Sequence, residues 1–139
     1  MTLLTKSNLV IQTAFLGDLI LAIPLLRRIR KLYPEDKLIV ACKQGLGEFL
    51  MTELLVDEVF ELQKSNSQSY KEALGRLKDY NIRNIFCLHR SVRSQLFTMQ
   101  IKAERKIGFS SLFNRLIGCW FFNELVAYSQ NNPEVLRQF

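Results

Sequence analysis

Two arginines that follow an apolar run in the second half of the chain could bind an anion. Arg90 and Arg93 stand in the segment HRSVRS (89–94), directly after the apolar run Asn84–Leu88. If Ser91 caps a helix, both guanidinium groups lie near free amide groups at its start, a combination that binds phosphate or carboxylate groups well. The simpler interpretation is that both arginines are solvated surface residues.

An acidic residue ends the loop TAFLGD (13–18), which follows the first apolar run, Asn8–Gln12. Gly17 permits a positive φ or the close approach of a ligand. Asp18 stands where a helix begins, and capping and the helix dipole favour a carboxylate there. Asp18 is therefore a helix cap or a functional acid, and the loop alone does not decide. The single glycine excludes a GxGxxG fingerprint and no GK[ST] follows, so the loop does not predict an NAD or ATP site.

Short β-rich runs alternate with helical stretches along the chain. We expect strands at 8–12, 37–42, 58–62, 84–88 and 105–109, with 124–127 as a candidate sixth. The expected helices cover 19–33, 46–55, 68–80 and 91–102, and a last one begins at 134. Pro24 lies inside the first helix, so that helix should kink there or become regular only near that point.

This alternation predicts a single α/β domain (1–139), a Rossmann-like doubly wound parallel sheet with helices on both faces. In the strand order 3-2-1-4-5, strands one and four are neighbours where the winding reverses, and ligands bind beyond their carboxyl ends. The Asp18 loop and the 89–94 segment should then face each other across a crevice. Lys43, after the second strand, and Lys106 are expected to reach the same side.

Composition favours an anionic partner. The 139 residues carry a net charge of +6 and a predicted pI of 9.4, which suits phosphate, an acidic sugar or a membrane surface. No aromatic-interleaved basic groove or nucleic-acid motif is present, so we expect no nucleic-acid partner. The alternative is a domain that is merely basic.

Metal and redox chemistry find little support in the sequence. The three cysteines, Cys42, Cys87 and Cys119, form no CxxC, and His89 is the single histidine. We therefore expect no metal site, no cofactor and a reducing cytoplasm. No apolar run is long enough to span a bilayer. The apolar segment Leu112–Phe122 could lie at a membrane interface, although a helix that covers the core or a second domain explains it equally.

Several motifs, taken in order, resemble the lipopolysaccharide heptosyltransferases, glycosyltransferase family 9. A strand, the dipeptide Gly17-Asp18, five further residues before Pro24 and a basic helix that ends before Tyr33-Pro34 look like the start of that family. The resemblance continues through VDEV (56–59), HRSVRS (89–94), KIGF (106–109) and EVLR (134–137). One departure is Asn131-Asn132, where many members of the family carry a histidine.

The resemblance implies the acceptor-binding, N-terminal half of a GT-B type enzyme that transfers heptose from a nucleotide-activated donor to the anionic lipopolysaccharide inner core. Asp18 would be the general base. The acceptor-binding residues would be Thr13, Gly17, Lys43, Arg90, Arg93 and Lys106. The donor would bind a C-terminal domain that this chain does not contain. Such an enzyme works in the cytoplasm, with possible peripheral contact at the inner membrane.

Two other interpretations stay open. The chain could be a truncated module that binds anionic glycolipid without catalysing a reaction. Alternatively, it could be a nucleotide-binding Rossmann domain of another enzyme, although the missing glycine-rich fingerprint argues against that.

Overall fold

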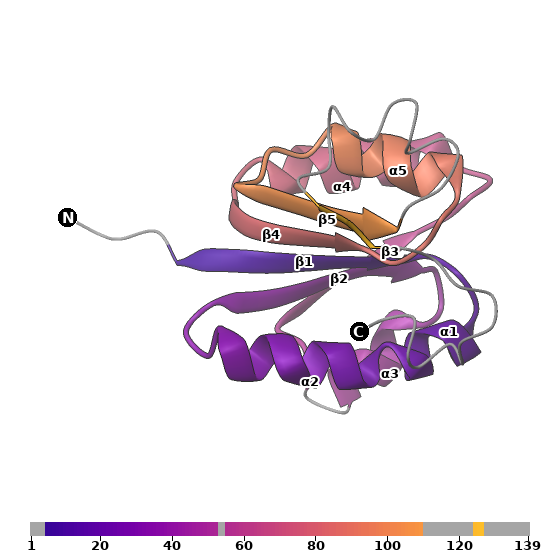
Figure 1. Ribbon diagram of the computed structural model, residues 1–139. Coiled ribbons are helices and arrows are strands. Elements are labelled where there is room, and N and C mark those ends of the chain that lie inside the picture. The colour runs from indigo at the N-terminus through magenta and orange to yellow at the C-terminus, as the bar shows by residue number, and fades with distance from the viewer. Residues whose placement is uncertain (1–4, 53–54, 110–123, 127–139) are drawn as a thin grey trace.

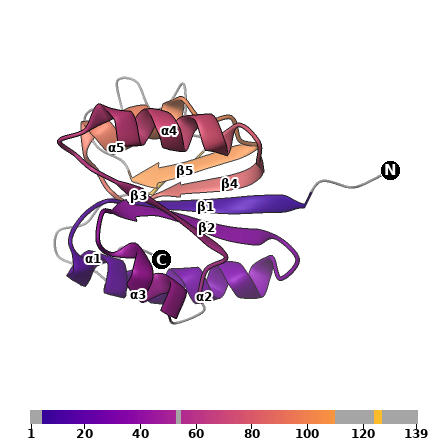
Figure 2. The same ribbon diagram turned by 180° about the vertical axis from the view of Figure 1, so that it is seen from behind.

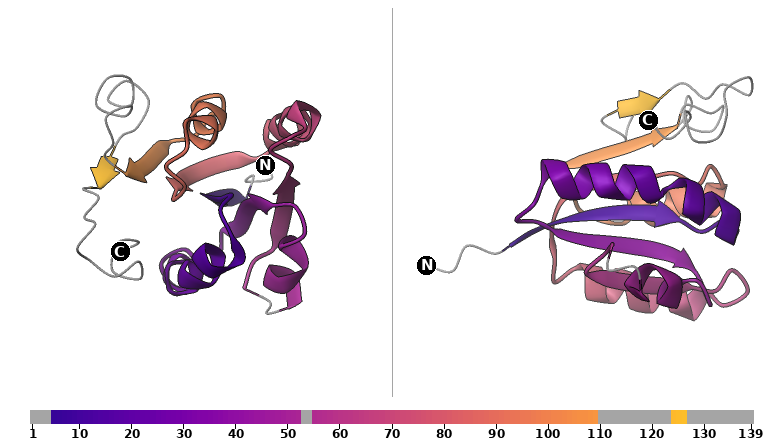
Figure 3. Two further views of the ribbon diagram at one scale, coloured as in Figure 1. Left: turned by 90° about the vertical axis from the view of Figure 1, so that its right-hand side faces the viewer. Right: turned by 90° about the horizontal axis from the view of Figure 1, so that it is seen from below.

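A computed structural model of the chain describes residues 5–52, 55–109 and 124–126. Its centre is a six-stranded sheet in the order β3-β2-β1-β4-β5-β6, and every neighbouring pair is parallel (Figure 1). The strands are β1 Lys6–Gln12, β2 Lys37–Lys43, β3 Glu58–Leu62, β4 Asn81–Cys87, β5 Arg105–Phe109 and β6 Glu124–Val126. The expected order 3-2-1-4-5 is confirmed, and β6 extends the sheet beyond β5 (Figure 3).

Helices cover both faces of the sheet. One face carries α1 (Leu16–Leu21), α2 (Ile23–Leu32) and α3 (Gly47–Thr52), and the other carries α4 (Ser67–Leu77) and α5 (Val92–Met99) (Figures 1 and 2). Side chains of β1 alternate between the two layers: Leu9 and Ile11 pack in the core beneath α4 and α5, whereas Val10 packs in the core beneath α2. Both faces of β1 are apolar because both are covered. The expected segment Leu112–Phe122 and the helix from 134 lie outside the described residues.

The first helix begins earlier than expected and is interrupted. Instead of one helix over 19–33, α1 ends at Leu21 and α2 starts at Ile23, with Ala22 between them. Pro24 then lies in the first turn of α2. An amide hydrogen is not needed at that position and the proline φ suits the helix. The expected irregularity near Pro24 is therefore confirmed as a break between two helices.

A polar network joins the amino halves of β1 and β4. Asn84 donates to the side-chain oxygen of Asn8 at 2.8 Å, and Asn8 donates to the Asp36 carboxylate at 3.1 Å. Arg83 donates to both oxygens of the same carboxylate, at 2.7 and 3.3 Å. Asn8 and Asn84 are buried, at 1% and 3% exposure. The buried Asn84 amide therefore depends on Asn8 for its hydrogen bond, and Asn8 in turn holds Asp36.

We expect Asn8→Leu to lower the free energy of unfolding by about 2–3 kcal/mol, because it leaves the amide of Asn84 buried without a partner and removes one of the three hydrogen bonds to the Asp36 carboxylate. Chemical denaturation measures the loss. The double variant Asn8→Leu/Asn84→Leu should cost less than the two single changes added together, because it removes both members of the pair. Strict additivity would contradict the role of this network. Ser65→Ala, in an exposed loop, is the control for a neutral substitution.

Candidate functional site

The site lies where β1 and β4 end side by side. β1 and β4 pair in parallel up to Ile11 and Cys87, and the Leu88 amide then donates to the Ile11 carbonyl at 2.9 Å. This last bond brings the loop after β1, with Thr13 to Phe15, next to the loop after β4, with His89 to Ser91. The two loops therefore meet at the carboxyl edge of the sheet, as the strand order required.

Three hydroxyl groups surround one nitrogen of His89. The Nδ1 atom lies 2.7 Å from Thr13 Oγ1, 3.1 Å from Ser94 Oγ and 3.1 Å from Ser91 Oγ. The hydroxyls also contact one another: Thr13 and Ser94 are 2.9 Å apart, and Ser91 and Ser94 are 3.1 Å apart. Thr13 and Ser94 are each only 1% exposed. The buried Thr13 hydroxyl therefore supports His89 and is not open to a ligand.

The charge state of His89 follows from its surroundings. Burial lowers the pKa of His89 below its ordinary value, and the positive charge of Lys64 lowers it further. The negative charge of Asp18 opposes both effects. His89 is consequently a neutral imidazole at physiological pH, and the charges of Asp18 and Lys64 both reach it.

Asp18 has a structural role that can be seen directly. It is the third residue of α1, and its Oδ2 accepts a hydrogen bond from the Phe15 amide at 3.2 Å. This is half of a capping box, since Phe15 has no side-chain acceptor for the reciprocal bond. Capping does not preclude chemistry, because no hydrogen bond from another described residue reaches the second oxygen, Oδ1.

Gly17 does not adopt the left-handed backbone that the sequence allowed. It lies inside α1, and the positive φ among the described glycines belongs to Gly45, at 91°. A Cβ added at Gly17 would meet no atom within 4 Å. Gly17 therefore leaves open space on α1 next to Asp18.

Lys43 reaches the first loop. Its Nζ lies 4.9 Å from the centroid of the Phe15 ring, a cation–π distance, and Phe15 itself is 70% exposed. A positive charge therefore stands beside the loop that carries Asp18, as expected for Lys43.

Arg93 reaches toward the loop between β3 and α4. Its Nη1 donates to the Lys64 carbonyl, and its guanidinium lies 5.9 Å from the centroid of the Tyr70 ring. Lys64, Ser65, Tyr70, Ser91 and Arg93 line an open cavity of about 470 Å³. Because Ser91 also touches His89, this cavity adjoins the hydroxyl cluster. Arg90 is exposed in the loop between β4 and α5, and its carbonyl accepts from Gln95 at 3.2 Å.

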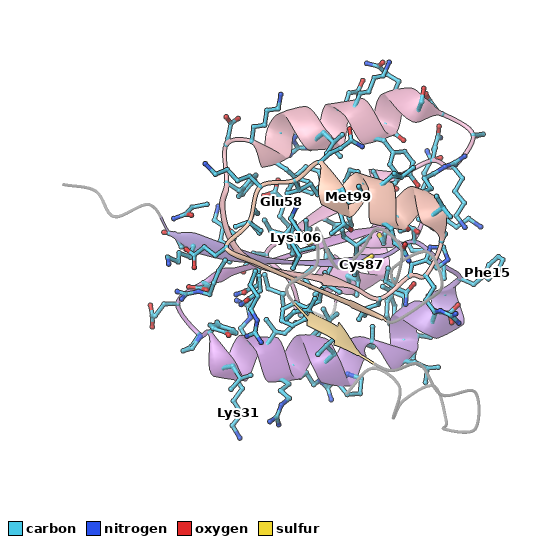
Figure 4. The ribbon with its side chains drawn as sticks, turned by 45° about the horizontal axis from the view of Figure 1, so that its top comes forward. Phe15, Lys31, Glu58, Cys87, Met99 and Lys106 are labelled. Carbon is cyan, nitrogen blue, oxygen red and sulfur yellow. The ribbon has the colours of Figure 1, made fainter. Side chains whose placement is uncertain are left out.

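Lys106 is not brought to the site. Its Nζ donates to the Met99 carbonyl at 3.3 Å, at the carboxyl end of α5, and burial lowers its pKa. Helix α5 begins at the carboxyl edge of the sheet and runs toward the amino edge. The carboxyl end of α5, with Met99, therefore lies near the start of β5. Figure 4 shows Lys106 well separated from Phe15.

Ser91, Ser94 and His89 belong to this site although they were not among the residues predicted to bind the acceptor. The available signal was the spacing of HRSVRS, which places Ser91 at the helix cap and Ser94 one turn later, on the side of α5 that faces the sheet.

Among the described residues, no group of His, Cys, Asp and Glu side chains could hold a metal ion. In the same part of the chain, no helix is both long and apolar enough to cross a membrane.

Solved glycosyltransferases share this fold. A family 9 glycosyl transferase from Veillonella parvula DSM 2008 is 20% identical over 95% of this chain and 38% of its own, with a TM-score of 0.72. The E. coli heptosyltransferase WaaC, solved with ADP, is 18% identical over 96% of this chain and 44% of its own, with a TM-score of 0.79. WaaC solved with ADP-2-deoxy-2-fluoro heptose is 16% identical over 96% and 46%, with a TM-score of 0.78.

The fold is that of these glycosyltransferases. The expected Rossmann-like, GT-B type architecture is confirmed, and the resemblance to heptosyltransferases holds at the level of the fold across nearly the whole chain. The chain spans less than half the length of these structures. No family model matches the sequence, and no curated protein matches it.

Two substitutions of Asp18 separate its capping role from any chemical role. Asp18→Ala should lower the free energy of unfolding by about 1 kcal/mol, because the Phe15 amide loses its acceptor and the first turn of α1 loses a negative charge. Asp18→Asn keeps an acceptor oxygen and should cost half of that or less. Thermal and denaturant unfolding of both variants measures this difference. Equal stability of wild type and Asp18→Ala would show that the cap contributes nothing.

Proposed function

We propose that this chain is the acceptor-side domain of a heptosyltransferase-like glycosyltransferase of family 9. One observation carries the proposal: Asp18 is held at the carboxyl edge of the sheet, within electrostatic reach of His89, in a fold that matches heptosyltransferases along nearly the whole chain. The motifs of the sequence, in the same order, support the same family.

The proposed reaction is an inverting transfer of heptose. Asp18 takes the proton from an acceptor hydroxyl as that oxygen attacks the anomeric carbon of a nucleotide-activated heptose, and the bond to the nucleotide breaks. Positive charge develops on the sugar ring, as in glycoside hydrolysis. Because the Phe15 amide holds Oδ2, the other oxygen of Asp18 is the natural proton acceptor.

The acceptor is proposed to be the phosphorylated inner core of lipopolysaccharide. Lys43 lies beside the first loop, and Lys64 and Arg93 line the cavity next to Ser91. Cations on both sides of the crevice suit a substrate that carries several negative charges, since they can fix its position relative to Asp18. Thr13 acts indirectly in this proposal, by supporting His89.

The donor is proposed to be a nucleotide-activated heptose held by a second domain. WaaC was solved with ADP and with ADP-2-deoxy-2-fluoro heptose. The loop after β1 in this chain lacks a phosphate-binding fingerprint, so a donor site elsewhere fits the residues better.

A glycolipid-binding module without catalysis is the second candidate, favoured by the capping role of Asp18. It predicts acceptor binding without transfer under any condition.

A thermal-shift screen addresses the third candidate, a nucleotide-binding domain. Phosphorylated core sugars should raise the Tm of this domain, and nucleotides alone should not.

In a protein that combines this domain with a nucleotide-sugar-binding domain, Asp18→Asn should lower kcat about 10²- to 10⁴-fold, because the general base is lost. The affinity for the inner-core oligosaccharide, measured by calorimetry, should stay within about threefold, since only the protonation chemistry changes. Asp79→Asn removes an exposed carboxylate at the opposite edge of the sheet and is the matched control. Unchanged transfer by Asp18→Asn would remove Asp18 from the mechanism.

We also propose peripheral contact with an anionic membrane through α1 and Phe15, the residue that precedes it. Phe15, Leu16 and Ile20 are 70%, 43% and 44% exposed, and Lys43 lies over the Phe15 ring. The following helix, α2, adds the exposed cations Arg27, Arg28 and Lys31. Apolar side chains next to cations suit an interface of anionic lipids.

Co-sedimentation with phosphatidylglycerol vesicles tests this contact. Phe15→Ser/Ile20→Ser should weaken binding at least tenfold, because each exposed apolar side chain contributes on the order of 1–2 kcal/mol on burial in the interface. Val92→Ser/Leu96→Ser is the matched control, since these residues are 50% and 44% exposed on α5, on the other face of the sheet. Equal loss in both variants, or no loss in either, would exclude α1 as the contact.

A further inference from the structure

The hydrogen bonds of Ser91 have a fixed direction, and they limit how the rest of the hydroxyl cluster around His89 can be arranged. The Ser94 amide donates to Ser91 Oγ at 3.2 Å, and the Ser91 hydroxyl donates to Ser94 Oγ at 3.1 Å. The single proton of Ser94 is then free to go to Thr13 Oγ1, at 2.9 Å, and that of Thr13 to His89 Nδ1, at 2.7 Å. In this arrangement each hydroxyl donates once and accepts once.

If the hydrogen bonds ran in the opposite direction, one buried hydroxyl would have no acceptor for its proton. If Nδ1 carried a hydrogen and donated to Thr13, the Thr13 proton would pass to Ser94, and the Ser94 proton would have no acceptor left in the cluster. Because Thr13 and Ser94 are each 1% exposed, water cannot readily compensate, and an unused buried donor is costly. The neutral His89 therefore accepts at Nδ1 and carries its hydrogen on Nε2.

The Nε2 side of the ring is the side left open. Nδ1 faces the buried Thr13 and Ser94, whereas His89 as a whole is only partly buried. No described residue makes a hydrogen bond with Nε2, and Nε2 is not among the buried polar atoms that lack a partner. Among the described residues, none therefore takes up the Nε2–H group, and the charge of Asp18 reaches the ring at the carboxyl edge of the sheet.

We propose that His89 is a substrate-positioning residue whose Nε2–H donates a hydrogen bond to the same acceptor hydroxyl that gives its proton to Asp18. The inference rests on the proposed glycosyl transfer. The hydroxyl oxygen has two lone pairs, so one accepts from Nε2–H while the other attacks the anomeric carbon. Thr13, Ser91 and Ser94 act through His89, because they hold the ring and its tautomer, and the buried Thr13 and Ser94 do not touch the substrate.

The tautomer can be measured without any substrate. His89 is the single histidine of the chain, so a protein labelled with ¹⁵N-histidine gives one imidazole spectrum. We expect ¹⁵N shifts of the neutral Nε2–H form, and Thr13→Val should produce a mixture of tautomers because the donor to Nδ1 is lost. The control is Thr98→Val, which removes another buried hydroxyl from the same region, one that donates to the Ser94 carbonyl at 2.8 Å and does not contact His89. A Nδ1–H tautomer in the wild type, or equal spectra for wild type and Thr13→Val, would overturn the proposal.

Two substitutions of His89 then test the ligand contact by calorimetry with the inner-core oligosaccharide. In His89→Asn the amide occupies the place of Nδ1 and the Nε2–H is lost, so we expect affinity to fall about three- to tenfold, the value of one hydrogen bond. In His89→Gln the amide reaches the place of Nε2, and affinity should largely recover. Circular dichroism and the Tm of both variants identify any loss that comes from unfolding.

The outcomes separate this proposal from the proposed function. Folded His89→Asn and His89→Gln proteins that bind as tightly as the wild type would overturn the positioning role. A wild-type protein that holds the Nε2–H tautomer yet binds no inner-core oligosaccharide would overturn the acceptor assignment, whereas the placement of the His89 N–H would stand.

Discussion

The parallel pairing of β1 with β4 is the contact on which the rest of the molecule depends. These strands are neighbours in space although β2, β3 and four helices separate them in sequence. At their amino halves, Asn8 and Asn84 form a buried hydrogen bond that also holds Asp36. At their carboxyl ends, the Leu88 amide reaches the Ile11 carbonyl. A slip of one residue would turn Leu9 and Ile11 to the opposite layer and separate Thr13 from His89.

This pairing produces a site with neutral, buried hydroxyl groups inside and charged groups at the surface. Thr13 and Ser94 lie below the surface with their hydroxyls in a closed cluster, and His89 stands above them as a neutral ring. Asp18, Lys43 and Lys64 bring charge to the same edge of the sheet. Because the buried part is neutral and fully hydrogen-bonded, the domain avoids the cost of burying a charge and leaves its charged groups available to a substrate.

The break between α1 and α2 is a second consequence of local chemistry. Pro24 cannot continue a helix from α1 without clashing with the preceding turn, so α1 is a separate, short element. Its apolar residues Leu16 and Ile20 remain exposed because a helix of this length covers only the corner of the sheet. Asp18 thus lies on a small element at the rim, held by a single cap, whereas His89 lies on the strand–helix connection that is tied to the core.

The sequence by itself determined the class of fold, the strand order and the meeting of the two loops. Apolar periodicity and the right-handed crossover leave few topologies, and Pro24 alone predicts the irregular first helix. Only the tertiary structure decided where the side chains turn. Arg93 donates to the Lys64 carbonyl, and Lys106 donates to the Met99 carbonyl at the carboxyl end of α5. Thr13 is buried and contacts His89. Spacing places a residue near an edge, but the direction of a long side chain depends on partners that the fold brings from distant segments, and the sequence pattern does not show those partners.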